Sequence, residues 1–242
     1  MSEAPAADRS RQRAPRGRGA ELRGELLRAA MDLLAETGSE KAVSVRAIAT
    51  RVGVSVASVY LHFADKQALV DAVCEEVFET LHVRLREVSE STSDPVQALR
   101  AQGRAYVRFA LDNPEHYRLV MMLEHSPGPE ATDRAIAGGA FRHLVESVQR
   151  CVDAGVYRSD PVEVALGLWA ATHGVAALLI AKPSFPWPDV DDFVDRTVRM
   201  AGLGMAVADR VAAEETTERV VARLAALEGP PGVDADPGGS SG

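Results

Sequence analysis

The sequence predicts an all-α protein in which a small three-helix domain precedes a larger helical domain, with about nine helices in total. The first observation is apolar residues spaced by three and four positions, a pattern typical of helices. It is clear in the segment 20–37, at Leu22, Leu26, Ala29, Ala30, Leu33 and Leu34. The second is that prolines, which cannot continue a helix, separate such segments. They are Pro114, Pro127, Pro129, Pro183, Pro186 and Pro188. Third, the chain has no run of alternating β-branched residues bounded by hairpin turns.

Capping residues mark the first four helices. Gly38 ends the first one, over 20–37. Ser44 can cap a short second helix that reaches about Arg51, Ser55 a third, and Asp65 a fourth that runs to about Val88. The first three form a domain over 20–66, and the fourth, over 65–88, links it to the rest of the chain.

The larger domain is expected over 89–228. Its helices are predicted at 95–112, 115–125, 140–154, 161–181 and 190–212, and the last of them extends or restarts through Leu227. The segments 1–19 and 229–242 have nothing to pack and are expected to be disordered. In the first of these, Arg9, Arg11, Arg13, Arg16 and Arg18 form a basic arm that either contacts DNA or only solubilises the chain.

Charge is distributed unevenly along the 242 residues. The net charge is −8, yet residues 1–66 hold 11 Lys and Arg against 8 Asp and Glu. A basic first part and an acidic remainder indicate that only the first part meets a polyanion. The 24 residues from Lys41 to Ala64 contain no carboxylate at all.

Several functional classes are not indicated. Cys74 and Cys151 have no motif spacing, so neither a metal site nor a disulfide framework is expected. No phosphate loop, zinc-binding helix or nucleophile elbow occurs, which argues against an enzyme, and no cofactor is expected. The apolar stretch 164–181 is of borderline length for a membrane span. It lacks anchors at both ends, so a buried helix in a cytoplasmic protein is the preferred interpretation, with no membrane partner.

The segment 45–63 has the spacing of a helix-turn-helix. Two helices that cross through a tight turn need a small residue where they touch, here Ala49, and a residue that accepts positive φ in the turn, here Gly53. Apolar anchors then seal the crossing, and these are Ile48, Val52, Val54 and Val59. The second helix of such a motif lies in the major groove of DNA.

The outward residues of the second helix suit close approach to DNA. Small side chains let the backbone enter the groove, where Val56 and Ala57 can meet a thymine methyl, and Tyr60 and His62 can donate to phosphates. A lysine such as Lys66 at a helix N-terminus is unfavourable, unless its ammonium and the helix N-terminus bind the same phosphate. A solvated lysine is the alternative. An ordinary core helix is the alternative for the whole segment. The candidate DNA-binding residues are Ser44, Val45, Arg46, Ser55, Val56, Ala57, Ser58, Tyr60, His62 and Lys66.

The stretch SVRAIATRVGVSVASVYLHFADKQAL resembles the helix-turn-helix signature of the tetracycline-repressor (TetR) family of transcriptional regulators. Ser44 stands where that family often has Thr, and Ala57-Ser58 where it often has Gly-Thr. The piece WAATHG, with Trp169, His173 and Gly174, is similar to a Trp-x-x-x-His-Gly pattern of one subgroup. The resemblance implies a repressor that binds a palindromic operator as a homodimer and is released by a small-molecule effector. An alternative is a regulator that acts without an effector or through a protein partner.

The resemblance also implies that helices near 161–181 and 190–212 pair with those of a second copy. Small residues there, such as Ala170, Gly174 and Gly204, suit either that pairing or an intrachain core. An effector pocket is expected among the helices of the larger domain, lined by residues with an apolar body and a polar tip or a flexible chain. These candidates are Tyr106, Phe109, His116, Tyr117, Met121, Met122, Trp169 and His173, with ordinary core packing as the alternative.

Overall fold

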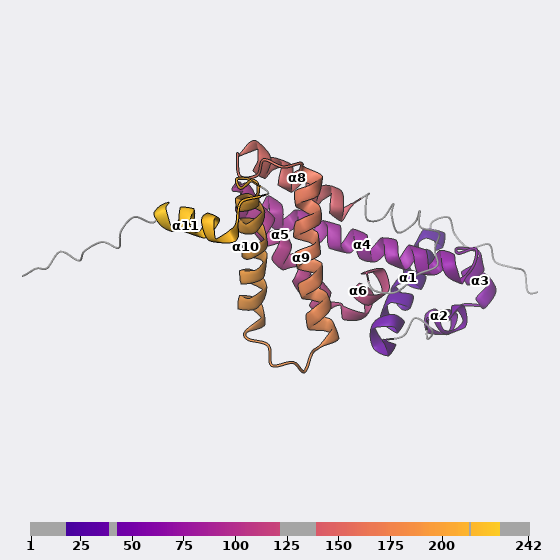
Figure 1. Ribbon diagram of the computed structural model, residues 1–242. Coiled ribbons are helices and arrows are strands. Elements are labelled where there is room, and N and C mark those ends of the chain that lie inside the picture. Colours follow the sequence, from indigo (N-terminus) through magenta and orange to yellow (C-terminus); the bar gives the residue numbers. More distant parts are fainter. Residues whose placement is uncertain (1–17, 39–42, 122–138, 213, 228–242) are drawn as a thin grey trace, which may run out of the picture.

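The computed structural model describes residues 18–38, 43–121, 139–212 and 214–227 (Figure 1). These residues form ten helices and no strand, which confirms the all-α prediction. The helices are α1 (Arg18–Thr37), α2 (Val45–Val52), α3 (Val56–Tyr60), α4 (Lys66–Glu90), α5 (Pro95–Asp112), α6 (Pro114–Met121), α8 (Ala140–Asp153), α9 (Pro161–Ala181), α10 (Val190–Ala208) and α11 (Thr217–Leu227).

The predicted caps set the starts of the helices in the first domain. The Ser44 hydroxyl accepts a hydrogen bond from the Ala47 amide at 3.2 Å, and Ser55 accepts one from the Ser58 amide at 3.1 Å. Asp65 caps α4 through a 2.7 Å bond from the Ala68 amide. Each cap satisfies one of the amides that a helix N-terminus leaves without an intrahelical partner.

Helices α1, α2 and α3 form a compact head around a shared core. Leu26 and Ala30 of α1, Ile48 of α2 and Val59 of α3 are all fully buried. Gly53 adopts φ 77° after α2, and the Val54 amide bonds back to the Ala49 carbonyl at 2.9 Å. This left-handed turn, which favours glycine, sets the crossing of α2 and α3 and confirms the helix-turn-helix prediction.

The long α4 runs from the head into the body of the molecule (Figure 1). It packs against α1 in the head and against α5, α6 and α8 in the body. Helices α9 and α10 lie beside each other, and both pack on α5. The short α6 contacts α1, α4 and α5, so it stands between the head and the body.

The C-terminal boundaries differ from the sequence prediction. Helix α10 ends at Ala208 instead of 212 because Asp209 is engaged with the loop before α9. Its carboxylate accepts from the amides of Arg158 at 2.8 Å and Ser159 at 3.3 Å. The chain then restarts as α11, which projects away from the body (Figure 1). The segments expected to be disordered were 1–19 and 229–242. Arg18 and Gly19 instead begin α1, and the rest of both segments lies outside the described residues.

Among the described helices, α9 is the one long and apolar enough to cross a membrane by length and composition, and 44% of its most apolar window is buried inside the protein. It packs against α5, α8 and α10. A helix that packs against three neighbouring helices is typical of a protein core, so α9 has the contacts of a core helix.

Candidate DNA interface and ligand cavity

The outward face of α3 exposes most of the residues expected to meet DNA. Ser55, Val56 and Ala57 are exposed at its start, and Tyr60 is 50% exposed at its end. Val59 on the opposite face is fully buried. One residue therefore anchors the short helix while the others face outward, which is not the exposure of an ordinary core helix.

Two further residues of this face are half-buried. The Ser58 hydroxyl lies 2.8 Å from the Ser55 hydroxyl, so the two side chains hold the first turn of α3 together. The His62 ring lies beside the first turn of α1, where a Cβ placed on Gly19 would come within 3.9 Å of it. Leu61, which sequence reasoning did not single out, is 84% exposed next to Tyr60.

At the start of α2, the structure corrects one prediction. Ser44 is half-buried as the cap, and Arg46 is exposed. Val45, however, is 9% exposed and belongs to the core. It shares the inner face of α2 with Ile48 and Ala49, three and four residues later, so its side chain cannot reach DNA.

The Arg51 side chain forms an ion pair within the head. Its guanidinium donates to both carboxylate oxygens of Glu36 on α1, at 2.9 and 2.5 Å. This bidentate pair raises the pKa of Arg51 and lowers the pKa of Glu36, chiefly through the hydrogen bonds between them. The pair holds α2 against α1, whereas Arg46 on the same helix is exposed.

Lys66 is exposed at the first position of α4, directly after the Asp65 cap. Asp65 itself bonds the Ala68 amide, so its carboxylate is engaged by the helix. The ammonium therefore stands at the positive end of a 25-residue helix, as the sequence predicts.

A cavity of about 500 Å³ lies in the body, lined by residues of α4, α5, α6, α8, α9 and α10. Its lining is mostly apolar. The residues are Phe78, Leu81, Leu85, Val96, Gln97, Leu99, Arg100, Gln102, Gly103, Tyr106, Met121, Ala140, Phe141, Leu144, Val156, Tyr157, Leu168, Trp169, Thr172, Val198, Arg199, Ala201, Gly202, Leu203 and Ala206. Its size and lining are those of a small-molecule site.

Three of the predicted ligand contacts line this cavity, namely Tyr106, Met121 and Trp169. Two others, Phe109 and His116, lie elsewhere. Phe109 is packed in the core, and the His116 ring contacts the Met31 carbonyl of α1 at 3.1 Å.

Tyr117 and His173 lie one layer behind the cavity wall. The Tyr117 hydroxyl is 2.6 Å from His173 Nδ1 and 3.1 Å from the Tyr106 hydroxyl, which in turn accepts from Trp169 Nε1 at 3.2 Å. Burial raises the pKa of both tyrosines and lowers the pKa of His173. These hydrogen bonds orient Tyr106 and Trp169 toward the cavity. The predicted contact Met122 lies outside the described residues.

Ion pairs join α5 to α10 beside the cavity. Asp195 accepts hydrogen bonds from Arg100 Nε at 3.0 Å and from Arg104 at 2.8 Å, and these bonds lower its pKa to about 2. Next to this pair, Gly103 lets the helices approach closely, since a Cβ there would lie 2.8 Å from Val198. The wall between α5 and α10 is therefore fixed by both charge and shape.

Sequence reasoning missed several residues of the lining. Phe141 and Tyr157 bring aromatic surface from α8 and from the loop after it, and no local spacing relates them to Tyr106. Gln102 is 2% exposed in the middle of α5. A polar residue on the inner face of an otherwise apolar helical pattern was the signal that could have identified it.

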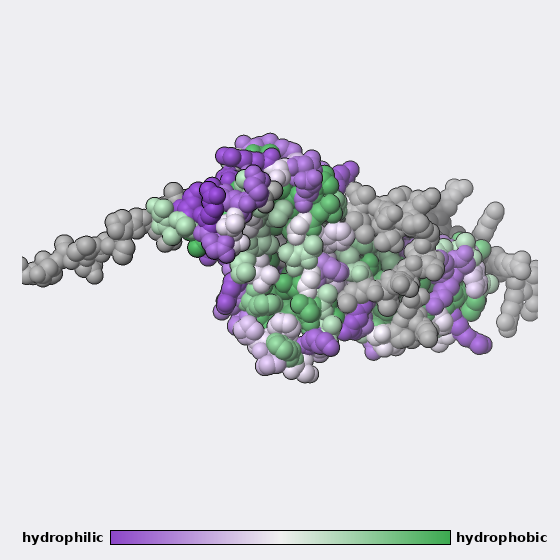
Figure 2. Space-filling model, in the orientation of Figure 1, coloured by the Kyte–Doolittle hydropathy of each residue, from purple (hydrophilic) through white to green (hydrophobic). Residues whose placement is uncertain are grey.

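The surface of α9 and α10 exposes apolar side chains. Leu166, Leu178, Met200 and Leu203 are each about half exposed. Hydrophobic and weakly polar residues gather along these helices (Figure 2). Among the described residues, none outside the neighbouring helix backbone comes within 4 Å of a Cβ placed on Gly174 or Gly204. In contrast, Gly167 packs against Met205 and Gly202 against Tyr157, so those two glycines serve the intrachain core.

Comparison with known proteins agrees with this architecture. Residues 26–73 match the family model described as bacterial regulatory proteins, tetR family, and residues 99–201 match the tetracyclin repressor-like C-terminal domain. The transcriptional activator FasR of Mycolicibacterium smegmatis is 32% identical over 190 residues, which are 77% of this chain and 84% of FasR.

Two further similarities cover different shares of the chain. The transcriptional repressor KstR2 of Mycobacterium tuberculosis is 35% identical over 104 residues, 43% of this chain, and the chain spans half of KstR2. A structure of a protein with unknown function from Rhodococcus sp. RHA1 superposes with a TM-score of 0.68 at 29% identity, covering 82% of this chain and all of that one. The chain belongs to the tetR family of bacterial regulatory proteins, which are DNA-binding transcriptional regulators and not enzymes.

Proposed function

We propose that the protein is a cytoplasmic repressor that binds a palindromic operator as a homodimer and is released by a small-molecule effector. The observation that carries this proposal is an exposed α3 face in a carboxylate-free segment, joined through α4 and α6 to an apolar cavity of about 500 Å³. The first feature suits a polyanion, and the second suits a small molecule.

On the DNA side, α3 enters the major groove. Val56 and Ala57 contact base edges, because their small exposed side chains let the helix approach closely. Tyr60, Arg46 and Lys66 contact phosphates, which fix the position of the head without reading sequence. Ser44, Ser55, Ser58 and His62 complete the proposed interface.

On the dimer side, α9 and α10 pair with the same helices of a second copy. The half-exposed Leu166, Leu178, Met200 and Leu203 gain burial in such a pairing, and Gly174 and Gly204 permit close approach of the partner. One α3 reaches only a few base pairs, so two symmetric heads are needed for a specific site.

Coupling between cavity and head runs through α6. Met121 at its end lines the cavity, Tyr117 bonds to the cavity residue Tyr106, and His116 contacts the Met31 carbonyl of α1. A ligand that displaces Met121 or Tyr106 therefore shifts α6 against the head. It releases DNA in proportion to its preference for the shifted arrangement.

A three-step experiment tests the function. The full chain selects DNA from a random pool, and we expect an inverted repeat bound by a dimer. Small molecules that raise the melting temperature are then tested for release of that DNA. Recovery of no preferred sequence, or a protein that binds the selected DNA only as a monomer, contradicts the proposal. Stabilising molecules that never weaken DNA binding favour a regulator without an effector or one that responds to a protein partner.

The direction of regulation needs a separate measurement, because KstR2 is named a repressor and FasR an activator. Transcription in vitro from a promoter that carries the selected site decides between them. We expect transcription to fall when the protein is added and to recover with the effector. A rise on addition of the protein contradicts repression while leaving DNA binding intact.

A further inference from the structure

A residue of the cavity lining carries a buried hydrogen-bond acceptor that no described group satisfies. Gln102 of α5 is 2% exposed and lines the cavity, and its side-chain oxygen has no hydrogen-bond partner. Within the described residues, the other buried side-chain atom in this condition is His82 Nδ1, and His82 is not part of the cavity lining. An unsatisfied buried acceptor is unfavourable and rare in folded proteins.

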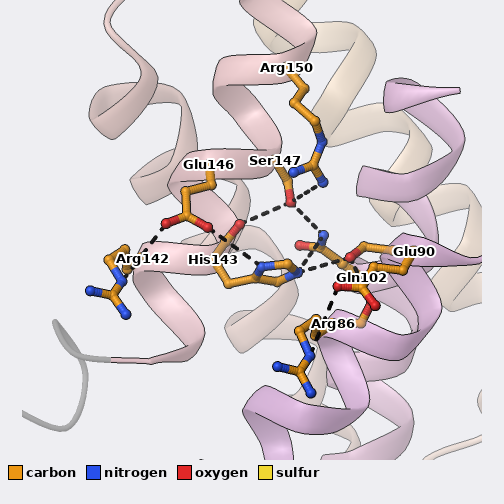
Figure 3. A network of polar contacts seen from close by, with 9 residues as sticks. Arg86, Glu90, Gln102, Arg142, His143, Glu146, Ser147 and Arg150 are labelled. Atoms are coloured by element: carbon orange, nitrogen blue, oxygen red, sulfur yellow. Dashed lines mark hydrogen bonds and ion pairs between the residues drawn. The ribbon is translucent and has the colours of Figure 1, made fainter. Parts of the chain in front are cut away.

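The orientation of the Gln102 amide follows from its neighbours (Figure 3). Its nitrogen donates to the Ser147 hydroxyl at 2.6 Å and lies 3.4 Å from His143 Nε2. The Ser147 hydroxyl donates its own hydrogen to the His143 carbonyl at 2.9 Å, so toward Gln102 it acts as an acceptor. Arg150 also donates to Ser147 at 2.9 Å. The nitrogen is therefore held toward Ser147, and the oxygen remains without a partner.

The surroundings of this oxygen define what can satisfy it. Phe78, Leu81, Phe141 and Leu168 give the cavity an apolar wall that favours a hydrocarbon body. The Arg100 guanidinium also lines the cavity but is engaged by Asp195.

We infer that the effector is a largely apolar molecule carrying one hydrogen-bond donor, a hydroxyl or an N–H, that binds the side-chain oxygen of Gln102. This inference rests on the proposed effector function and adds the chemical class of the ligand. A site that offers a buried acceptor rejects an analogue whose donor is blocked, because the acceptor then stays unsatisfied.

Matched probes test this inference on the full-length protein. 4-Octylphenol and 4-octylanisole differ only in methylation of the oxygen, so only the phenol can donate. We expect the phenol to bind at least about tenfold more tightly in calorimetry, the effect of satisfying one buried acceptor. 4-Octylbenzoate, an acceptor at neutral pH, is the anionic comparison, because the exposed Arg199 also lines the cavity.

Two variants locate the effect. Gln102→Met keeps the side-chain volume but removes the acceptor, so the preference for the phenol over the anisole should disappear. Gln149→Met is the matched control, because Gln149 is an exposed glutamine of α8 outside the cavity lining, and this variant should keep the preference for the phenol. If Gln102→Met does not fold, the relative affinities of the phenol and the anisole for the unaltered protein still test the inference.

The inference is overturned if the anisole or the benzoate binds as tightly as the phenol, or if none of the probes binds. It is also overturned if Gln102→Met keeps the full preference. Operator release is measured in parallel with each probe. If the phenol and the anisole bind equally well and release DNA, the inference alone is refuted. If the phenol binds more tightly than the anisole but leaves DNA bound, only the proposed effector function is refuted.

Discussion

Replacement of Lys66 by Gln tests how the head docks on DNA. Lys66 is exposed at the first position of α4, where its charge opposes the positive end of the helix dipole. If the ammonium and the helix N-terminus bind the same phosphate, removal of the charge weakens DNA binding. If Lys66 is only a solvated lysine, removal leaves DNA binding unchanged.

The expected size follows from counterion release. Each lysine that neutralises a phosphate contributes about 0.9 to the slope of log affinity against log salt, so two copies in a dimer contribute about 1.8. Salt rises fourfold between 50 and 200 mM. With a slope difference of 1.8, the ratio of wild-type to variant affinity for DNA falls about 12-fold over this range.

The assay is a titration of the selected operator at four salt concentrations, with melting curves of the free proteins. Lys182→Gln is the matched control. It removes the same charge from an exposed lysine at the end of α9, outside the head. A slope for Lys66→Gln that equals that of wild type, or an equal change with Lys182→Gln, refutes the docking of α4 on a phosphate.

Four other changes test separate parts of the molecule. Tyr60→Phe should lower affinity for every DNA sequence by about 10- to 100-fold per dimer, with an unchanged salt slope, because the lost phosphate donor is uncharged. Ala57→Gln should change the sequence recovered from a random pool, since this exposed residue is placed against base edges. Gly174→Glu should give a folded monomer in analytical ultracentrifugation, because a Cβ at this position meets none of the described residues beyond its own helix, and the new side chain adds a charge to the proposed dimer face. Burial lowers the pKa of His143 below its ordinary 6.5, so the unfolded chain takes up that proton first. The stability that neutral His143 contributes is complete above about pH 6.5 and is lost as the pH falls through the lower pKa of the folded protein. His143→Gln should therefore reduce the decrease in melting temperature over this pH range.

The head was readable from the sequence because its determinants are local. Ser44 and Asp65 act on amides three residues away, and Gly53 sets its turn through its own backbone. Ile48 and Val59 sit in the core at the spacing that the crossing of two helices requires. The error at Val45 has the same origin, because the α2 register places it on the inner face with Ile48.

The cavity was less readable because its lining comes from distant parts of the chain. Phe78 of α4 and Ala206 of α10 line one space, and no spacing within either helix indicates it. Tyr106 and Tyr117 looked alike in sequence as amphipathic aromatic residues. Tertiary packing puts one at the wall and the other behind it.

The fold itself limits how an effector can act on DNA. The larger of two buried apolar clusters runs from Leu26 in α1 through Tyr117 in α6 to Val198 in α10, so the head shares its core with the body. Closely packed interiors transmit small displacements and do not absorb them. An effector in the cavity needs only to bind better when α6 is displaced, and that difference in affinity sets how far the operator equilibrium shifts. A ligand that binds tightly but equally well to both arrangements should stabilise the protein against heat and leave the operator occupied.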